Sequence, residues 1–178
     1  MHFLDSIRPR PKVRYKVLPR EDIELIEPLW HKLNDHHMAR STHFAAFYDM
    51  FTFNQRMEKM RDRTLRVRID VALIDDDEKK TPRNPKGYSV KLDGKMIGYS
   101  LSSVNKRAEG ELDSLFVDRD FRRMGVGTNL AKRSFAWMDK EGALTKSLSV
   151  VYGNEEVLPF YRNFRFYPSR LELNERLW

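Results

Sequence analysis

ELDSLFVDRDFRRMGVGT, residues 111–128, contains the strongest structural signal in this chain. Its first part is rich in apolar residues and predicts a strand, and its second part is a glycine-containing loop that opens a helix. Gly125 and Gly127 let the backbone approach a ligand closely, and Arg122 and Arg123 bring positive charge to the same mouth. The N–H groups in the first turn of a helix lack partners and attract an anion. The stretch therefore predicts a phosphate-binding loop.

The loop differs from two common phosphate-binding motifs. G-x-G is followed by Thr128 and Asn129, so the dinucleotide fingerprint G-x-G-x-x-G is absent, and no Gly-Lys-Ser/Thr sequence marks a P-loop. The spacing is instead R-x-x-G-x-G directly after the apolar residues 115–117.

A second motif follows one strand later in SLSVVYGNEEVLPFYRNFRFYP, residues 147–168. Residues 147–152 are rich in β-branched side chains and predict a strand, and Gly153-Asn154 is a turn signal. The next residues match the spacing N-x-x-x-x-x-[FL]-Y-x-x-x-G-F at Asn154, Phe160, Tyr161 and Phe166.

Together the two motifs resemble those of the GCN5-related N-acetyltransferases, the GNAT superfamily. The resemblance is specific over residues 96–168 and only topological over 13–75. It implies an α/β (α+β) fold with a central, mixed, mostly antiparallel twisted sheet of six to seven strands, flanked by about four helices. The chain departs from the family pattern at Arg123 and Arg165, where relatives often carry glycine. Arg165 indicates a different cap or a shifted turn after the last helix.

The resemblance implies acetyl-CoA as the acetyl donor. By motif position it assigns the cofactor contacts to Leu115, Phe116, Val117, Arg122, Arg123, Met124, Gly125, Val126, Gly127, Thr128 and Asn154. The backbone of 115–117 would hold the pantetheine and polarise the thioester carbonyl, which needs a donor as negative charge develops. Asn154 would contact the cofactor near the thioester, although an Asn after a Gly also suits a plain turn or N-cap.

Acetyl transfer to an amine also needs a proton donor for the departing thiolate and a route for the amine proton. The resemblance assigns the acid to Tyr161, which could instead be a core aromatic residue. Glu111 lies where some family members carry a catalytic glutamate, and Asp113 is the next candidate because the two share a strand face. A water chain without a dedicated base is the alternative.

These features predict an acetyl-CoA-dependent N-acetyltransferase that transfers an acetyl group to a primary amine by direct attack in a ternary complex. The chain has no cysteine, so no acyl-cysteine can form. The alternative is a non-catalytic module of the same fold that binds acyl-CoA or a protein. The acceptor is open among small amines, aminoglycoside-like compounds, protein N-termini and lysine side chains, and family members often form homodimers.

Composition narrows the function only slightly. The chain has 178 residues, 40% of them hydrophobic, and suits a single domain over 1–178. A net charge of +7 gathers partly in a basic N-terminal arm, residues 1–12, which we interpret as a solvated segment rather than a nucleic-acid site. No apolar run reaches the roughly 20 residues that span a membrane, and no signal peptide is evident, so we expect a cytoplasmic protein.

The remaining segments predict the element order β-α-α-β-β-β-α-β-α-β. Strands are expected at 13–18, 65–74, 88–104 as a hairpin around Asp93-Gly94, 110–117, 147–152 and 166–173. Helices are expected from residue 19, over 43–61, over 126–140 and over 155–163, with an exposed charged loop at 75–87.

The histidines do not predict a metal site. His31 and His36 are five residues apart, which does not place two ligands on one helix face, and no glutamate motif accompanies them. In the GNAT fold the first helices border the acceptor cleft, so His37, His43 and Tyr48 are candidates for substrate contact.

Overall fold

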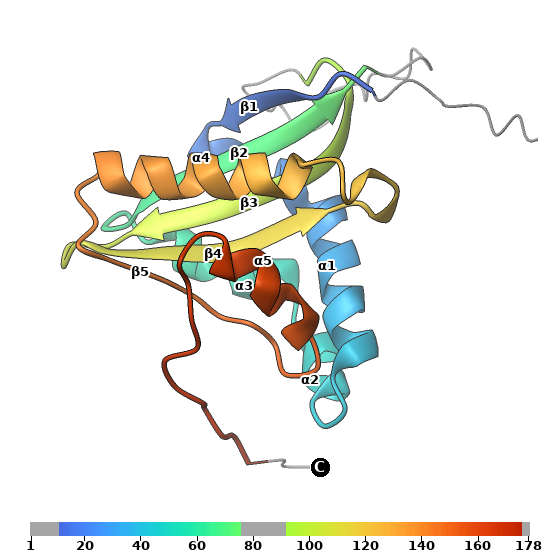
Figure 1. Cartoon of the computed structure of the whole chain (residues 1–178), viewed down its shortest axis with the longest axis vertical. Coiled ribbons are helices and arrows are strands. Elements are labelled where there is room, and N and C mark those ends of the chain that lie inside the picture. The colour runs from blue at the N-terminus through green and yellow to red at the C-terminus, as the bar shows by residue number, and fades with distance from the viewer. Residues whose placement is uncertain (1–10, 76–91, 176–178) are drawn as a thin grey trace, which may run out of the picture.

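Five strands form one mixed sheet in the order β1-β2-β3-β4-β5 (Figure 1). The computed structural model describes residues 11–75 and 92–175. The first four strands are antiparallel neighbours, and β5 runs parallel to β4. The strands are β1 Arg14–Leu18, β2 Arg66–Ile74, β3 Lys95–Val104, β4 Glu109–Val117 and β5 Thr145–Leu148.

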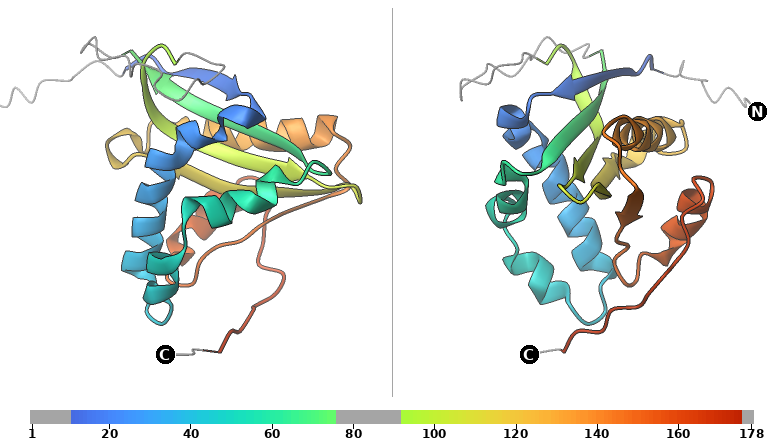
Figure 2. Two further views of the ribbon diagram at one scale, coloured as in Figure 1. Left: turned by 180° about the vertical axis from the view of Figure 1, so that it is seen from behind. Right: turned by 90° about the vertical axis from the view of Figure 1, so that its left-hand side faces the viewer.

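Helices cover both faces of this sheet (Figure 2). On one face α4 packs across β2, β3 and β4, and α5 lies beside it; on the other face lie α1, α2 and α3. The helices are η1 Arg20–Ile26, α1 Glu27–Arg40, α2 Ala45–Met50, α3 Phe53–Arg61, η2 Arg119–Phe121, α4 Val126–Lys140, η3 Glu155–Val157 and α5 Leu158–Arg162, where η marks 3-10 helices.

The hydrophobic core follows from this layering. On the α1/α3 face, Ile26 and Met57 pack against Ile69 and Leu101 of the sheet. On the α4 face, a stripe at helical spacing, which includes Leu130 and Met138, covers the central strands. The predicted bounds of α4 are confirmed. The sequence also predicts an apolar face on the first helix; of its positions Ile23, Ile26, Leu29 and Trp30 are buried, and Leu33 is partly buried.

A buried ionic cluster fixes α4 to the sheet. The Asp70 side chain on β2 is fully buried and accepts hydrogen bonds from Arg68 Nε at 2.6 Å and Arg133 Nε at 2.6 Å. If α4 moved away, the buried Asp70 carboxylate would lose its bond to Arg133, and leaving a buried charge without a partner is costly. The cluster therefore constrains where α4 can lie.

Two predicted strands differ from the structure. The sheet has five strands in the described residues, not six to seven, because 166–173 is extended but pairs with nothing. Tyr167, Leu171 and Leu173 there are exposed, so no packing contact offsets the cost of ordering a strand. The fifth strand occupies 145–148 rather than 147–152. The first arm of the predicted hairpin, at 88–91, and nearly all of the loop 75–87 lie outside the described residues.

The predicted helix over 43–61 is two helices, α2 and α3. The break lies at Thr52, whose side chain accepts a hydrogen bond from the Gln55 backbone N–H while Gln55 bonds back to the Thr52 backbone. This is a capping box, and its T-x-x-Q signature was readable in the sequence.

The turn after α5 corrects the interpretation of Arg165. Its φ is +66°, the left-handed conformation that glycine adopts at a helix C-terminus. Arg165 N–H donates to the Arg162 carbonyl at 2.9 Å, and Phe166 N–H donates to the Tyr161 carbonyl at 3.2 Å. These two bonds form a Schellman motif, so arginine takes the glycine position of the ordinary cap without shifting the turn.

We predict that Arg165→Gly raises the free energy of unfolding by about 0.5–1 kcal/mol, because a left-handed non-glycine residue costs about 1–2 kcal/mol and the added chain entropy of glycine offsets part of this gain. Arg165→Ala removes the same charge but keeps the Cβ, and should not stabilise. Urea unfolding measures both, and equal effects of the two variants would show that backbone strain is not the cause.

Candidate functional site

The site begins where the sheet divides. β4 and β5 pair from Glu109↔Thr145 to Leu112↔Leu148 and no further. Residues 113–117 of β4 therefore have no strand partner on their β5 side within the described part of the chain. Backbone N–H and C=O groups need partners, so this open edge can pair with an extended ligand.

The predicted phosphate loop lies at the end of that open edge. Asp118 N–H donates to the Ile97 carbonyl at 2.8 Å and fixes the end of β4, and η2 then turns the chain toward α4. Gly125 begins α4 with φ +80°, and no side chain among the described residues caps the first turn. The N–H groups of that turn are thus available to an anion, together with the positive end of the helix dipole.

Arg123 also has positive φ, at +63°. The residue that replaces the family glycine therefore keeps the glycine conformation, and its side chain is exposed. Arg122 is held differently: its Nε donates to the Val117 carbonyl at 3.0 Å, and its guanidinium lies 5.8 Å from the centre of the Phe116 ring. Both arginines remain at the mouth of the loop.

The second motif packs against the loop. A Cβ on Gly127 would lie 3.6 Å from Val117, 3.8 Å from Phe160 and 3.9 Å from Leu115. Phe160 and Tyr161 make an edge contact with ring centres 5.0 Å apart, and both pack on the hydrophobic cluster beneath α4. Burial raises the pKa of Tyr161 to about 12, which keeps its hydroxyl protonated. A tyrosine hydroxyl must be protonated to act as a proton donor.

Helix α1 closes against the turn that precedes η3. A Cβ at Gly153 would lie 2.3 Å from the Arg40 carbonyl oxygen, so only glycine permits this approach. The adjacent Asn154 is buried, and its Oδ1 lies 3.3 Å from His36 Nε2. Arg40 also pairs with Glu156 at 2.8 Å. Asn154 thus serves as a turn residue and as a side-chain link to α1.

An open cleft of about 520 Å³ separates α1 from the phosphate loop. It is lined by Lys32, His36, Arg40, Phe116, Asp118, Arg119 and Arg122. Lys32 pairs with Asp118 at 2.5 Å, yet four cationic side chains outnumber that single carboxylate among the lining residues. The excess positive charge, the uncapped amides of α4 and the open edge of β4 suit a long ligand that carries phosphates.

Sequence reasoning missed the α1 wall of this cleft. Lys32, His36 and Arg40 recur every four residues and so form one basic helix face. The spacing can be read from the sequence, but the sequence does not show that this helix face lies opposite the predicted phosphate loop.

The proposed acid and base lie on opposite sides of the sheet. Tyr161 packs on the α4 side with Leu112, whereas the adjacent Glu111 points toward α3 and accepts a hydrogen bond from Lys59 Nζ at 2.5 Å. Asp113 Oδ1 also accepts a hydrogen bond from Lys59 Nζ, at 2.9 Å. The structure thus places predicted cofactor-contact residues of β4 and of the loop beside the split, and it places both carboxylate candidates on the far face.

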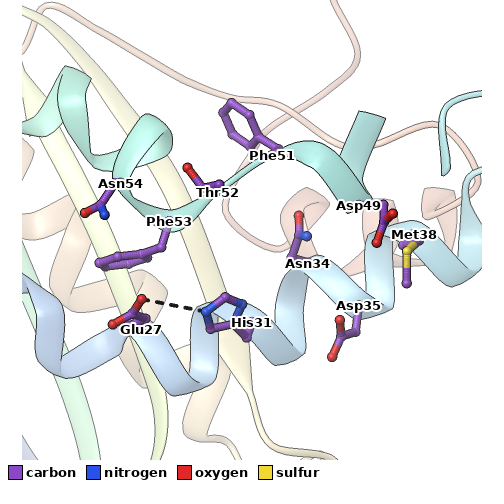
Figure 3. A pocket seen from close by; sticks show the side chains of 10 residues that line it. All are labelled: Glu27, His31, Asn34, Asp35, Met38, Asp49, Phe51, Thr52, Phe53 and Asn54. Atoms are coloured by element: carbon purple, nitrogen blue, oxygen red, sulfur yellow. Dashed lines mark ion pairs between the residues drawn. The ribbon is translucent and has the colours of Figure 1, made fainter. Parts of the chain in front are cut away.

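A second, smaller hollow of about 310 Å³ lies on the opposite flank of α1 (Figure 3). It is lined by Glu27, His31, Asn34, Asp35, Met38, Asp49, Phe51, Thr52, Phe53 and Asn54. Glu27 and His31 form an ion pair at 3.7 Å across its floor. The hollow is separate from the cleft, because residues 32, 36 and 40 face the other way on the same helix.

Comparison with known proteins places this geometry in a family. The model of the acetyltransferase (GNAT) family matches residues 44–166, which is more than half of the chain. The chain therefore belongs to the GNAT acetyltransferases, which use acetyl-CoA. A curated relative, an uncharacterized N-acetyltransferase of Methanocaldococcus jannaschii, is 31% identical over 91 residues; the match covers 47% of this chain and only 40% of that protein.

Solved structures with the same fold include two aminoglycoside acetyltransferases and a ribosomal-protein-alanine N-acetyltransferase. The enzyme meta-AAC0020 from an uncultured soil metagenomic sample has a TM-score of 0.58 at 15% identity, over 98% of this chain and 99% of that one. The Brucella melitensis ribosomal-protein-alanine enzyme has a TM-score of 0.57 at 15% identity, over 93% and 100%. AAC(6')-Iy in complex with CoA has a TM-score of 0.57 at 15% identity, over 96% and 97%. These similarities confirm the fold.

None of the helices within 11–75 and 92–175 has the length and apolar character needed to cross a membrane. The same residues contain no group of three histidine, aspartate or glutamate side chains arranged to hold a metal ion.

His37 points into the protein rather than into the cleft. Its ring lies 5.6 Å from that of Tyr48. Burial, with smaller contributions from His36 and Arg56, lowers the pKa of His37 from 6.5 to about 4. His37 is therefore neutral near pH 7.

The His37 environment predicts a pH-dependent stability. Since the unfolded chain binds this proton near pH 6.5 and the folded protein only near pH 4, the folded protein should lose stability as pH falls through that window. The loss is at most about 3 kcal/mol, because one pKa unit corresponds to about 1.4 kcal/mol. Urea midpoints of the wild type and His37→Phe between pH 7 and pH 4 test this. Parallel curves would contradict the assignment.

We predict that Gly125→Glu abolishes CoA binding, because it places bulk and negative charge at the uncapped first turn of α4. Gly142→Glu is the matched control: Gly142 has a similar φ of +76°, a Cβ there meets nothing within 4 Å, and it lies at the other end of the same helix. Calorimetric titration with CoA should show binding to the control only. Normal binding to Gly125→Glu would mean that the loop is misassigned.

Proposed function

We propose that this chain is an acetyl-CoA-dependent N-acetyltransferase that acetylates a primary amine by direct attack in a ternary complex. The observation that carries the proposal is the packing of Phe160 against Gly127 of the proposed phosphate loop, with Tyr161 in edge contact with Phe160, beside the open edge of β4. This contact brings an anion-binding turn, free backbone donors and a protonated tyrosine to one place.

The residues of the site suit acetyl-CoA on structural grounds. The first turn of α4 is uncapped, the cleft carries excess positive charge, and the absence of a side chain at Gly127 leaves the backbone accessible beside Leu115 and Val117. Arg122, Arg123 and the amides of Gly125, Val126, Gly127 and Thr128 would hold the phosphates. Bound acetyl-CoA supplies the acetyl group as an activated thioester.

The chain's own groups then perform three tasks. The backbone groups of 115–117 on the side without a partner strand orient the extended pantetheine arm and donate to the thioester carbonyl oxygen. Asn154, held by His36, fixes the turn beside them. Tyr161 donates its proton to the departing sulfur, and its burial excludes water from that step. No covalent link to the protein is needed.

The acceptor is a primary amine. The aminoglycoside acetyltransferases and the ribosomal-protein-alanine N-acetyltransferase among the structural relatives support two acceptor classes for trial, aminoglycoside amino groups and peptide N-termini. A homodimer remains part of the proposal, supported by the exposed apolar side chains of Tyr167, Leu171 and Leu173 on an unpaired segment.

We predict that Tyr161→Phe lowers turnover by roughly ten- to a thousandfold, the range that general-acid catalysis supplies, while the Kd for acetyl-CoA stays nearly unchanged. Tyr152→Phe is the control, since Tyr152 is exposed on the preceding turn. Release of the CoA thiol measures the rate, and calorimetry measures affinity. Full activity of Tyr161→Phe would exclude Tyr161 as the acid. Binding of acetyl-CoA without turnover on any amine would favour the non-catalytic module.

A further inference from the structure

The α3-facing side of β4 contains a buried polar cluster at a β-bulge. Leu101 pairs with Ser114 while Ser102 pairs with Leu112, so Asp113 is the additional residue of β4. The bulge turns both Asp113 and Ser114 toward α3, on the face that Figure 2 shows in its left view. Bulges redirect side chains in this way and are common beside active sites.

Asp113 is an unusual carboxylate. Its side chain is fully buried; Oδ1 accepts from Lys59 Nζ at 2.9 Å and Oδ2 accepts from Ser103 Oγ at 2.8 Å. The titratable or charged groups that face it are Lys59 and Arg56 from α3 and Glu111 from β4; Arg56 donates to its backbone carbonyl at 2.9 Å. Desolvation, with help from Glu111, raises the pKa of Asp113 despite the opposing effect of Lys59.

Two buried hydroxyls lie next to this carboxylate. Tyr99 on β3 is fully buried, and this burial raises the pKa of its hydroxyl. Ser114 Oγ lies near Tyr99 Oη and has a smaller, opposite effect on that pKa. Neither hydroxyl has a hydrogen bond of good geometry with any described residue. Paired polar atoms without partners are the surroundings in which a protein holds an ordered water.

The cluster lies beside the expected reaction centre. Ser114 directly precedes Leu115, in the part of β4 that has no partner strand on its β5 side and where the pantetheine is expected. Tyr161 packs on the opposite face of the sheet. An amine that attacks from the α1/α3 side would therefore meet Ser114 and Asp113, while the sulfur leaves toward Tyr161.

We propose that Asp113, rather than Glu111, accepts the proton that the acceptor amine loses, and that Tyr99 and Ser114 position the water that carries it. This inference rests on the proposed function. Tyr99 and Ser114 are positioning residues, since they act through the water. Glu111 is partly exposed and bonded to Lys59, so it connects Asp113 to solvent.

The protons balance along this route. The ammonium gives one proton through water to Asp113, which passes it to solvent past Lys59 and Glu111. The free amine nitrogen forms the C–N bond as the C–S bond breaks, and the sulfur takes the Tyr161 proton. The nitrogen then releases its second proton, which restores Tyr161, so one proton is released for each amide formed.

The test compares the wild type with Asp113→Asn, Ser114→Ala and Tyr99→Phe. Ser102→Ala is the matched control. Ser102 Oγ is also buried and without a hydrogen-bond partner, but it lies on the opposite face of the sheet, because Ser100, two residues earlier on β3, bonds to Ser134 of α4. The probe amines are sisomicin, lysine and a peptide with N-terminal alanine. For the most active probe, kcat and KM are measured from pH 5 to pH 10, and acetyl-CoA affinity is measured for every variant.

We expect Ser114→Ala and Tyr99→Phe to lower kcat roughly tenfold or more, and Asp113→Asn roughly a hundredfold, with unchanged acetyl-CoA affinity. Asp113→Asn should also remove the acid limb of the pH profile. The kcat of Ser102→Ala should stay within about twofold of the wild-type value, because Ser102 lies away from the proposed proton route. If Asp113→Asn fails to fold, the two hydroxyl variants still decide the question, since each removes a group without a partner.

Two results would overturn the inference while leaving the proposed function intact. One is an active wild type whose variants keep its rate and pH profile. The other is an equal loss in Ser102→Ala, which would indicate a packing effect. A wild type that binds acetyl-CoA but acetylates no amine would refute the proposed function, and this inference would fail with it.

Discussion

The separation of β4 from β5 after Leu112 is the constraint on which the rest of the site depends. A fully paired sheet would satisfy every backbone group of residues 113–117 and leave nothing for a ligand to bind. Here the pairing ends at Leu112↔Leu148, and helices cover the sheet on both faces around this point. The free backbone is thus exposed in a narrow, fixed position, which is how a small protein can orient a long flexible substrate without dedicated side chains.

The two ends of the proposed site beside this split differ in charge and in burial. The proposed phosphate end is exposed and basic, so it can attract an anion. The proposed chemical end contains the partly buried Tyr161 and the buried side chains of Asn154 and Asp113. Burial keeps the tyrosine protonated and makes the aspartate a stronger base than an exposed one. The same physical effect therefore supports opposite roles on the two faces of one strand.

Local sequence patterns predicted what local forces determine. R-x-x-G-x-G and the apolar stripe that follows gave the loop and the bounds of α4, because caps and helix periodicity act within a few residues. The sequence did not reveal that 166–173 would remain unpaired, since a strand exists only with a partner. Nor did it show that Lys32 and His36 face the phosphate loop, because helix spacing defines a face but not its neighbour. The individual cofactor contacts remain predictions, and two of the predicted residues, Phe116 and Arg122, line the cleft beside the open edge of β4.

The close contact between Gly153 and Arg40 has a consequence for how the protein forms. His36 and Asn154 are separated by 118 residues in sequence, yet they meet across that contact. Contacts between distant segments form late, because the intervening chain must first be ordered. During synthesis the sheet, α4 and most of α1 can assemble while the last segment is still being made, but the C-terminal end of α1 lacks its contacts with residues 153–156 until these have emerged. A nascent chain would thus hold a nearly complete scaffold that lacks Tyr161, so we expect incomplete chains to be inactive even when they are largely folded.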